Sequence, residues 1–146
     1  MQQHPGPRLP KGCVVNMKKV AFLTLLLLPL LLLAACTRGS YSALMAVENN
    51  TFTSMQMRYQ QFNGYKAKGF RLNEGETCEV TVDIVSDEGS LSLSITDQDG
   101  ESYYQGTDLP TSNFSVSLDK AGDYTIRVDA QKHSGSYDIS WETAKA

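Results

Sequence analysis

The chain has 146 residues, of which 41% are hydrophobic, and its formal net charge is −3 at pH 7. The charge is divided unevenly, since residues 1–35 hold four basic residues and no acid, whereas residues 36–146 hold 9 basic and 16 acidic residues. This acidic C-terminal part argues against a nucleic-acid partner, because it has no basic excess with which to neutralise phosphates. The three cysteines, Cys13, Cys36 and Cys78, are too few for a disulfide framework.

The N-terminal quarter of the chain does not have the pattern of a folded domain. Residues 1–16 contain three prolines, and a complete signal peptide begins after them, so we interpret them as a non-native or disordered extension. Residues 17–35 begin with Met17 and two lysines and continue as an apolar run. This run is shorter than the ~20 apolar residues of a membrane-spanning helix, and Pro29 interrupts it. We therefore predict a signal peptide over residues 17–35.

The apolar run ends in Leu33, Ala34, Ala35 and Cys36. This ending resembles the lipobox of bacterial lipoproteins, in which a branched apolar residue stands three positions before a cysteine and small residues fill the two positions between. The resemblance implies cleavage before Cys36 and attachment of acyl chains to Cys36, which anchor the mature protein in a membrane. It also implies an extracytoplasmic location, on the outer face of the cell membrane or, in a Gram-negative cell, in the outer membrane.

Residues 36–50 have a mixed and polar composition, so we expect the lipidated cysteine and a short tether in this range. Within it, residues 40–47 are compatible with either a first edge strand or a part of the tether. A tether of about a dozen residues keeps a folded domain close to the membrane.

From residue 51 onward, apolar and polar residues alternate with a period of two, which is typical of strands with one buried face. The alternation predicts strands at residues 54–59, 65–72, 77–85, 90–96, 101–105, 113–118, 123–130 and 136–142. The phase changes at Gly69, which predicts a bulge there and places Tyr65 and Ala67 on the buried face. Glycine-containing turn signals separate the runs at residues 63–64, 73–75, 87–89, 99–100, 120–123 and 133–135.

Seven to eight short strands, each with one polar face, predict an all-β domain over residues 51–146. We expect an antiparallel β-sandwich of jelly-roll or immunoglobulin-like topology. Residues 119–141 also resemble the end of the prepeptidase C-terminal type of secreted bacterial sandwich domain. The matching residues are Ala121, Gly122, Tyr124, Ile126, Val128, Gly135, Tyr137 and Ile139. Because such domains are accessory modules of enzymes, the resemblance implies a sandwich that is not itself catalytic.

No cofactor, metal site or catalytic set is expected in residues 36–146. One histidine, His133, and one free cysteine, Cys78, fall short of the three or four ligands of a zinc site. We interpret Cys78 as a small core residue and residues 97–101 as a hairpin turn, with calcium binding as the alternative for the latter. Acids that lie close together in the sequence are interpreted as solvated surface. A deep cleft holding two acids, or His133 within hydrogen-bond reach of a serine, would instead favour an enzyme.

Tyr103 and Tyr104 are the candidate ligand-binding residues. Neighbours on a strand point to opposite faces, so we expect one of these rings to be exposed on the weak strand at residues 101–105. We therefore predict a non-catalytic envelope lipoprotein, held in the membrane through Cys36, that binds a protein or a glycan at the cell surface. A structural, assembly or inhibitory role through protein contact is the alternative, and a hydrolase is the third.

Overall fold

The computed structural model describes residues 38–146. The predicted extension, the signal peptide, the lipobox and Cys36 therefore lie outside the described residues. No helix in the described part of the chain is long and apolar enough to cross a membrane.

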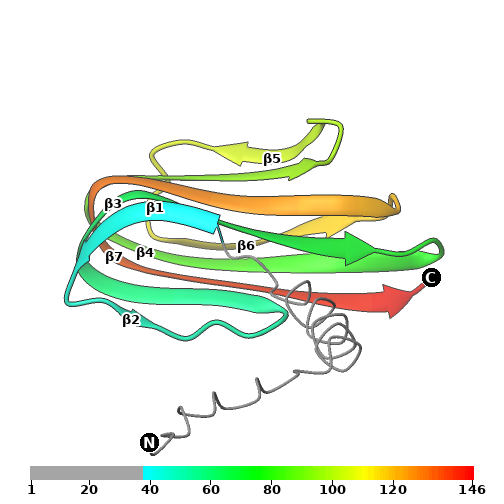
Figure 1. The fold of residues 1–146 in the computed structure, drawn as a ribbon, viewed down its shortest axis with the longest axis horizontal. Helices are drawn as coiled ribbons and strands as arrows, with labels where there is room; N and C mark the ends of the chain where they lie inside the picture. The colour runs from blue at the N-terminus through cyan, green and yellow to red at the C-terminus, as the bar shows by residue number, and fades with distance from the viewer. Residues whose placement is uncertain (1–37) are drawn as a thin grey trace, which may run out of the picture. The chain divides into compact units, whose positions relative to one another are not determined.

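Seven antiparallel strands make up the described part of the chain. They are β1 (Arg38–Leu44), β2 (Val47–Glu48), β3 (Ser54–Leu72), β4 (Glu76–Asp97), β5 (Ser102–Gly106), β6 (Ser112–Leu118) and β7 (Gly122–Lys145). The main order in the sheet is β1-β3-β7-β4-β5, while β2 pairs with β3 and β6 pairs with β4. The predicted all-β antiparallel sandwich is confirmed (Figure 1).

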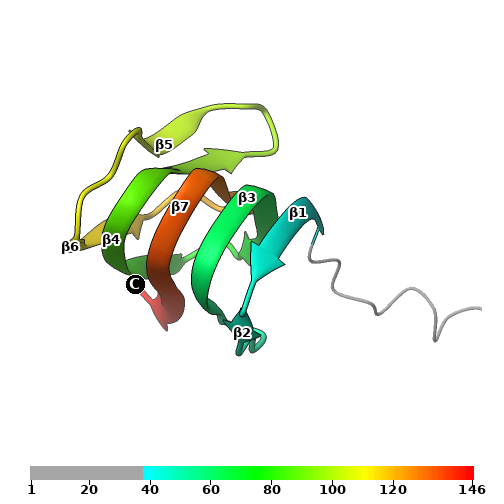
Figure 2. The ribbon, with the colours of Figure 1, turned by 90° about the vertical axis from the view of Figure 1, so that its left-hand side faces the viewer.

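Three strands are much longer than predicted, because each of them runs through both layers of the sandwich. Strands β3, β4 and β7 have 19, 22 and 24 residues. Their pairing is irregular at residues 59–64 of β3 and at residues 86–90 of β4, where the register shifts. The sheet bends at these irregularities, and Figure 2 shows the bends of β4, β7 and β3 side by side.

The bend divides one continuous sheet into two facing layers. The first, which we call the β1 layer, contains β1, β5 and the long-strand segments 62–72, 90–97 and 122–131. The second, which we call the β2 layer, contains β2, β6 and the segments 54–59, 76–86 and 135–145. Because β7 pairs with β3 on one side and with β4 on the other, it is the central strand of both layers.

Three of the predicted turns are not turns but parts of this bend. Residues 63–64, 87–89 and 133–135 lie inside β3, β4 and β7, so this part of the prediction was wrong. The backbone at Gly89 and Gly135 has φ values of +74° and +140°. A Cβ atom on Gly89 would meet the carbonyl oxygen of Lys132, and one on Gly135 would meet that of Val85. Glycine is therefore needed for the close approach of strands at the bend rather than for a reversal of the chain.

The other glycine signals connect strands as predicted, and the chain joins the sandwich earlier than expected. Residues 73–75 link β3 to β4, residues 98–101 link β4 to β5, and residues 119–121 link β6 to β7. Strand β1 pairs with β3 along its whole length. Of the two alternatives for residues 40–47, the structure thus shows an edge strand, and the sandwich includes residues that were expected to be tether.

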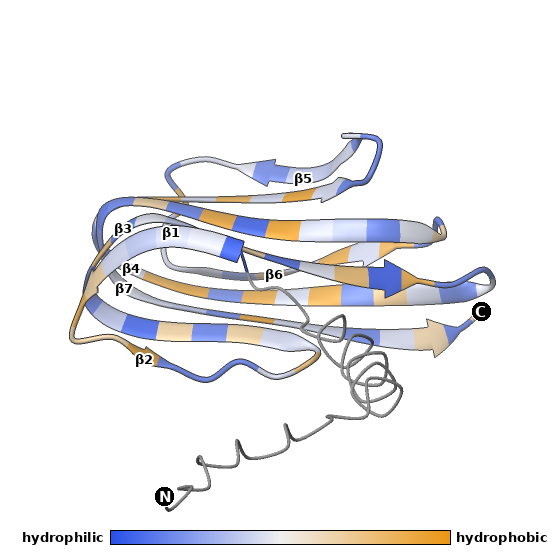
Figure 3. Cartoon of the chain, viewed as in Figure 1, coloured by the Kyte–Doolittle hydropathy of each residue, from blue (hydrophilic) through white to orange (hydrophobic). Residues whose placement is uncertain are grey.

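Side chains between the layers form one hydrophobic core. Hydrophobic and hydrophilic residues alternate along the long strands, as predicted (Figure 3). Strand β4 buries Cys78, Val80, Val82 and Ile84 in the β2 layer and Leu91, Leu93 and Ile95 in the β1 layer. The layers meet through stacked rings, since the centroid of Phe70 lies 5.1 Å from that of Trp141. Cys78 is a core residue as predicted, and burial raises the pKa of its thiol to about 11.

Strand β3 departs from the predicted phase in its second half. The register is regular at Gly69, so the bulge predicted there is absent, and the irregularity at the bend sets the phase instead. Lys66 and Lys68 consequently face the interior and are buried, whereas Tyr65 faces outward and is only half-buried. The prediction that Tyr65 is a core residue was wrong, because a shift of one residue moves every side chain to the other face.

The two buried lysines are bound by the segment that precedes β3 and by the first residue of β3. Lys66 forms an ion pair with Glu48 of β2. Lys68 donates hydrogen bonds to the carbonyl oxygens of Thr51 and Ser54. Both ammonium groups thus have polar partners, which is what allows them to be buried.

Candidate functional site

The two tyrosines predicted to bind a ligand are both half-buried on β5. The ring of Tyr103 packs edge-on against Tyr124, with centroids 5.2 Å apart, and the ring of Tyr104 lies 4.8 Å from that of Phe114. The expected exposed ring is not found, because an irregular register between β5 and β4 lets both rings reach the core. A role of Tyr103 and Tyr104 in ligand binding stays a prediction.

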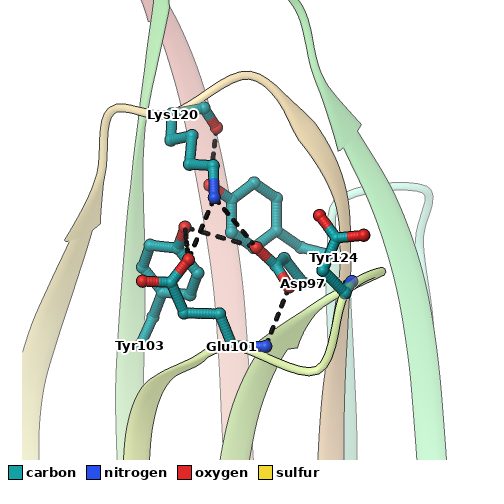
Figure 4. Close-up of polar contacts among 6 residues, drawn as sticks. Asp97, Glu101, Tyr103, Lys120 and Tyr124 are labelled. Carbon is teal, nitrogen blue, oxygen red and sulfur yellow. Dashed lines mark hydrogen bonds and ion pairs between the residues drawn. The ribbon is translucent and has the colours of Figure 1, made fainter.

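Tyr103 also belongs to a polar cluster at one end of the sandwich (Figure 4). The ammonium group of Lys120 lies 2.9 Å from the carboxylate of Glu101 and 3.4 Å from that of Asp97. The hydroxyl of Tyr103 donates to Asp97 at 3.4 Å, and the hydroxyl of Tyr124 donates to the carbonyl oxygen of Lys120 at 2.5 Å. The cluster joins the β4–β5 hairpin to the start of β7, which is a structural role.

Residues 97–101 form the predicted hairpin turn. One oxygen of Asp97 accepts the backbone N–H groups of Asp99 and Glu101, each at 2.9 Å. Burial opposes ionisation of the Asp97 carboxyl, but these donors together with Lys120 outweigh it and hold its pKa below the usual value. Within residues 38–146, no three acidic, histidine or cysteine side chains gather closely enough to hold a metal ion.

His133 is fully buried at the bend and is hydrogen-bonded through both ring nitrogens. The hydroxyl of Tyr59 lies 2.7 Å from Nδ1, and the hydroxyl of Ser86 lies 2.9 Å from Nε2. A serine within reach of this histidine is one of the two arrangements that would favour an enzyme. The position of the imidazole proton decides whether His133 could act as a base toward Ser86.

The tautomer of His133 argues against a catalytic role. Burial raises the pKa of the Tyr59 phenol, so its hydroxyl keeps a proton that needs an acceptor. Because Nδ1 is the acceptor within reach, we assign the imidazole proton to Nε2, which then donates it to the Ser86 oxygen. A ring in this state cannot take a proton from Ser86, and burial keeps it neutral by lowering the pKa of His133. The Tyr59–His133–Ser86 chain therefore holds the bend together.

A groove of about 400 Å³ lies on the outer face of the β2 layer, and we call it the sheet groove. Strands β2, β3, β7 and β4 form it, and its side chains come from positions that alternate with the core. They include Val47, Gln56, Arg58, Asp83, Val85 and Asp138. Because these positions belong to paired strands, the backbone fixes their spacing without a flexible loop.

Four polar side chains form a row across the outer face of this layer, one from each of four neighbouring strands. Gln56, Asp138 and Asp83 line the groove, and Asn113 of β6 continues the row beyond it. In the strand register Gln56 lies opposite Asp138, Asp138 opposite Asp83, and Asp83 opposite Asn113. Gln56 donates to Oδ2 of Asp138 at 2.5 Å, and Asn113 donates to Oδ2 of Asp83 at 3.2 Å. Among the described residues, the Oδ1 atoms of the two aspartates accept no side-chain hydrogen bond, so they remain available to a ligand.

The two aspartates of this row are like charges that face each other on adjacent strands. Such a pair weakens a sheet, by up to ~1 kcal/mol. Both side chains are exposed, so the packing of the core does not require them. The pair attracts hydrogen-bond donors and cations and repels anions, which defines the chemistry that the sheet groove accepts.

A second row beside the first mixes charge with small apolar groups. Val47, Arg58, Ser136 and Val85 lie opposite one another across four strands. The Arg58 guanidinium forms no ion pair within residues 38–146. The sheet groove thus offers free acceptors, free donors and two apolar contacts, a combination that suits a molecule with many hydroxyl groups.

Sequence reasoning placed Asp83 on the polar face of its strand but gave it no role, and it missed Gln56, Arg58 and Asp138. The alternation of residues shows that these side chains face outward, but not that they meet. They meet because β7 lies between β3 and β4, and no local pattern encodes that order. The available signal was charged and amide residues at non-core positions of three predicted strands.

Comparisons with known proteins add similarities but no family. No protein-family model matches the chain, and no curated protein matches it either. Among solved structures it is similar to TmCBM61 in complex with beta-1,4-galactotriose, with 12% identity over 74% of this chain and 88% of that chain and a TM-score of 0.42. A family 35 carbohydrate binding module from Clostridium thermocellum matches with 13% identity over 74% and 92% of the chains and a TM-score of 0.40.

A third similar structure is tailspike protein 4 of Bacteriophage CBA120, with 11% identity and a TM-score of 0.42. The match covers 75% of this chain but only 19% of that chain. With TM-scores below 0.5, none of these similarities carries a conclusion about the present chain.

Proposed function

We propose that this protein is a membrane-anchored envelope lipoprotein whose sandwich binds a neutral or amino-containing glycan in the sheet groove. The observation that carries the proposal is the row of Gln56, Asp138, Asp83 and Asn113, with one free oxygen on each carboxylate. The anchoring part rests on the lipobox that ends at Cys36.

The ligand class follows from what each group in the sheet groove can do. A sugar hydroxyl donates to one acceptor and accepts from one donor, so it can join an aspartate Oδ1 to a nearby N–H group. Arg58 supplies free donors, and Val47 and Val85 can pack against the C–H face of a ring. Glycans that carry sulfate, phosphate or carboxylate groups are disfavoured, because Asp83 and Asp138 repel them.

The same geometry supports binding rather than hydrolysis. Glycosidases place two carboxyl groups on opposite sides of the bond that they cleave. Here Asp83 and Asp138 stand next to each other on adjacent strands of one face, so both contact a ligand from the same side. The sheet groove does contain two acids, but it does not place them around a bond.

The test is retention of the soluble part of the mature chain, residues 37–146, on immobilised neutral and amino-containing polysaccharides. We expect retention by the unmodified protein and a loss of affinity of roughly 10-fold or more in Asp83→Asn and Asp138→Asn, since a hydrogen bond to a charged group contributes ~1.5–3 kcal/mol. Asp119→Asn is the matched control, because Asp119 is an exposed aspartate in the β6–β7 loop outside the groove. Tyr103→Ala and Tyr104→Ala test the site predicted from the sequence.

The outcomes separate the alternatives. Equal retention of both groove variants and the Asp119→Asn control would contradict the assignment of the sheet groove. Loss in a tyrosine variant of unchanged melting temperature would move the site to β5. Absence of retention on every glycan would contradict glycan binding and leave a protein partner as the ligand.

A further inference from the structure

Exposed hydrophobic side chains are concentrated on one edge of the sandwich. Within residues 38–146, six large hydrophobic residues are exposed, and all but Val85 lie in residues 38–53, which we call the edge segment. They are Tyr41, Leu44, Met45, Val47 and Phe52, of which Val47 faces the sheet groove and is left to its ligand. Met45 is 71% exposed and Phe52 is 88% exposed, so neither side chain contributes to the core.

The edge segment runs along the open side of the sandwich, where the two layers end. Strand β1 closes the β1 layer and β2 closes the β2 layer, both against β3. Phe52 lies near the beginning of β1, because Lys68 bonds the carbonyl oxygen of Thr51 while its neighbour Ala67 pairs with Arg38. The exposed residues are therefore spread along the edge that β1 and β2 form, rather than gathered in one loop. Figure 2 shows both strands on this edge.

One of these exposed residues, Met45, has a backbone conformation that lowers the stability of the fold. Met45 has a φ of +51°, in the left-handed region that residues other than glycine rarely adopt. A residue in this conformation is disfavoured by roughly 1–2 kcal/mol. Since the Met45 side chain packs against nothing in the core, folding of the sandwich does not account for its identity.

The edge segment differs in charge from the rest of the domain. It contains one base, Arg38, and one acid, Glu48, and Glu48 is paired with the buried Lys66. Residues 54–146 contain 8 bases and 15 acids, so the rest of the domain carries a net negative charge. Anionic headgroups repel an acidic surface, which leaves this edge as the side that can approach a lipid layer.

We propose that the edge segment is the surface with which the domain lies on the lipid bilayer. The inference rests on the anchoring part of the proposed function. If Cys36 carries the lipid, a single residue, Thr37, separates it from the start of β1 at Arg38. Such a short connection places the start of β1 at the headgroup layer. When the edge then lies flat on the bilayer, the exposed side chains of Leu44, Met45 and Phe52 enter the interface.

A second copy of the chain is the competing occupant of this edge. The outer side of β1 presents unpaired N–H and C=O groups, which another strand could bind. We favour the bilayer because the anchor starts at this edge and because the apolar residues extend beyond β1 to Phe52, which a strand pairing does not cover.

The test uses the lipidated mature protein reconstituted into phosphatidylcholine liposomes whose acyl chains carry bromine, a quencher of tryptophan emission. Trp141 is the single native tryptophan and is buried, so its emission is a background common to all variants. We expect Phe52→Trp to lose most of its added emission in brominated liposomes. Gln105→Trp, at an exposed position of the opposite edge strand β5, is the matched control and should keep its emission.

The readouts distinguish failure of the contact from failure of the anchor. If the protein floats with liposomes and Phe52→Trp is quenched no more than Gln105→Trp, the contact is wrong although the anchor stands. If the protein does not float with the liposomes, the anchoring proposal is wrong, and the inference about the edge segment, which rests on it, is wrong as well. Disulfide-linked dimers of Tyr41→Cys in the liposomes, together with an unquenched Phe52→Trp, would assign the edge to a second copy.

Discussion

The imidazole of His133 is out of contact with solvent and is held between two hydroxyl groups at the bend. Burial lowers its folded-state pKa below the 6.5 of the unfolded chain, so the native protein binds fewer protons than the unfolded one in acid. Stability is therefore at its full value above pH 6.5 and is lost as the pH falls through that value towards the folded pKa.

This pH dependence can be measured by urea unfolding between pH 7.5 and pH 5. We expect the free energy of unfolding of the unmodified protein to decrease over this range. His133→Gln should be less stable at neutral pH but should show a weaker dependence, because glutamine does not titrate. A variant with the same slope as the unmodified protein would mean that another group causes the loss.

Lys66 and Glu48 give a second prediction at the level of single residues. Lys66 is buried while Glu48 is partly exposed, so removing the acid leaves a buried cation without a partner. We expect Glu48→Gln to destabilise the protein by about 2 kcal/mol and Lys66→Met by less, because water can reach the remaining Glu48. The double variant should be more stable than the sum of the single effects implies, which a double-mutant cycle in urea would measure.

At the level of elements, the bend is the feature that makes two layers from three long strands. Gly135→Ala should lower the free energy of unfolding by ~2–3 kcal/mol. The new Cβ would meet the Val85 carbonyl oxygen, and alanine would be strained by the positive φ at this position. Gly75→Ala is the matched control, because Gly75 has a φ of +76° in the β3–β4 turn but no neighbour within 4 Å. It should cost about 1 kcal/mol. Equal midpoints of urea unfolding for the two variants would contradict the role of the bend.

The strands show which parts of the fold could be predicted from the sequence alone. Apart from residues 101–105, where both tyrosines rather than one pack against the core, period-two alternation located every core face except that of residues 65–68. There, two lysines occupy inward positions. Hydrophobicity could not reveal them, since their burial depends on Glu48 and on carbonyl oxygens before β3. The three glycine signals at the bend were indistinguishable from turns, because a bulge and a turn use the same residue type.

At the level of the whole molecule, strand order determines the candidate site. The sheet groove exists because β7 brings Asp138 between Gln56 and Asp83, which are 27 positions apart in the chain. A sequence with the same alternation but another strand order would keep its core and lose this row. The class of fold was thus predictable from local pattern, whereas the site required long-range pairing that local pattern does not contain.

The central position of β7 has a consequence for the time at which the protein can fold. β7 is the last of the seven strands to be synthesised, yet β3 and β4 have it as their shared partner and are not neighbours themselves. Until residues 122–145 have emerged, neither layer has its middle strand, and the non-local pairs that close the sheet cannot form. A chain built in this way stays loose throughout its synthesis and closes only around its final strand, which is the unfolded state that export of the proposed lipoprotein requires.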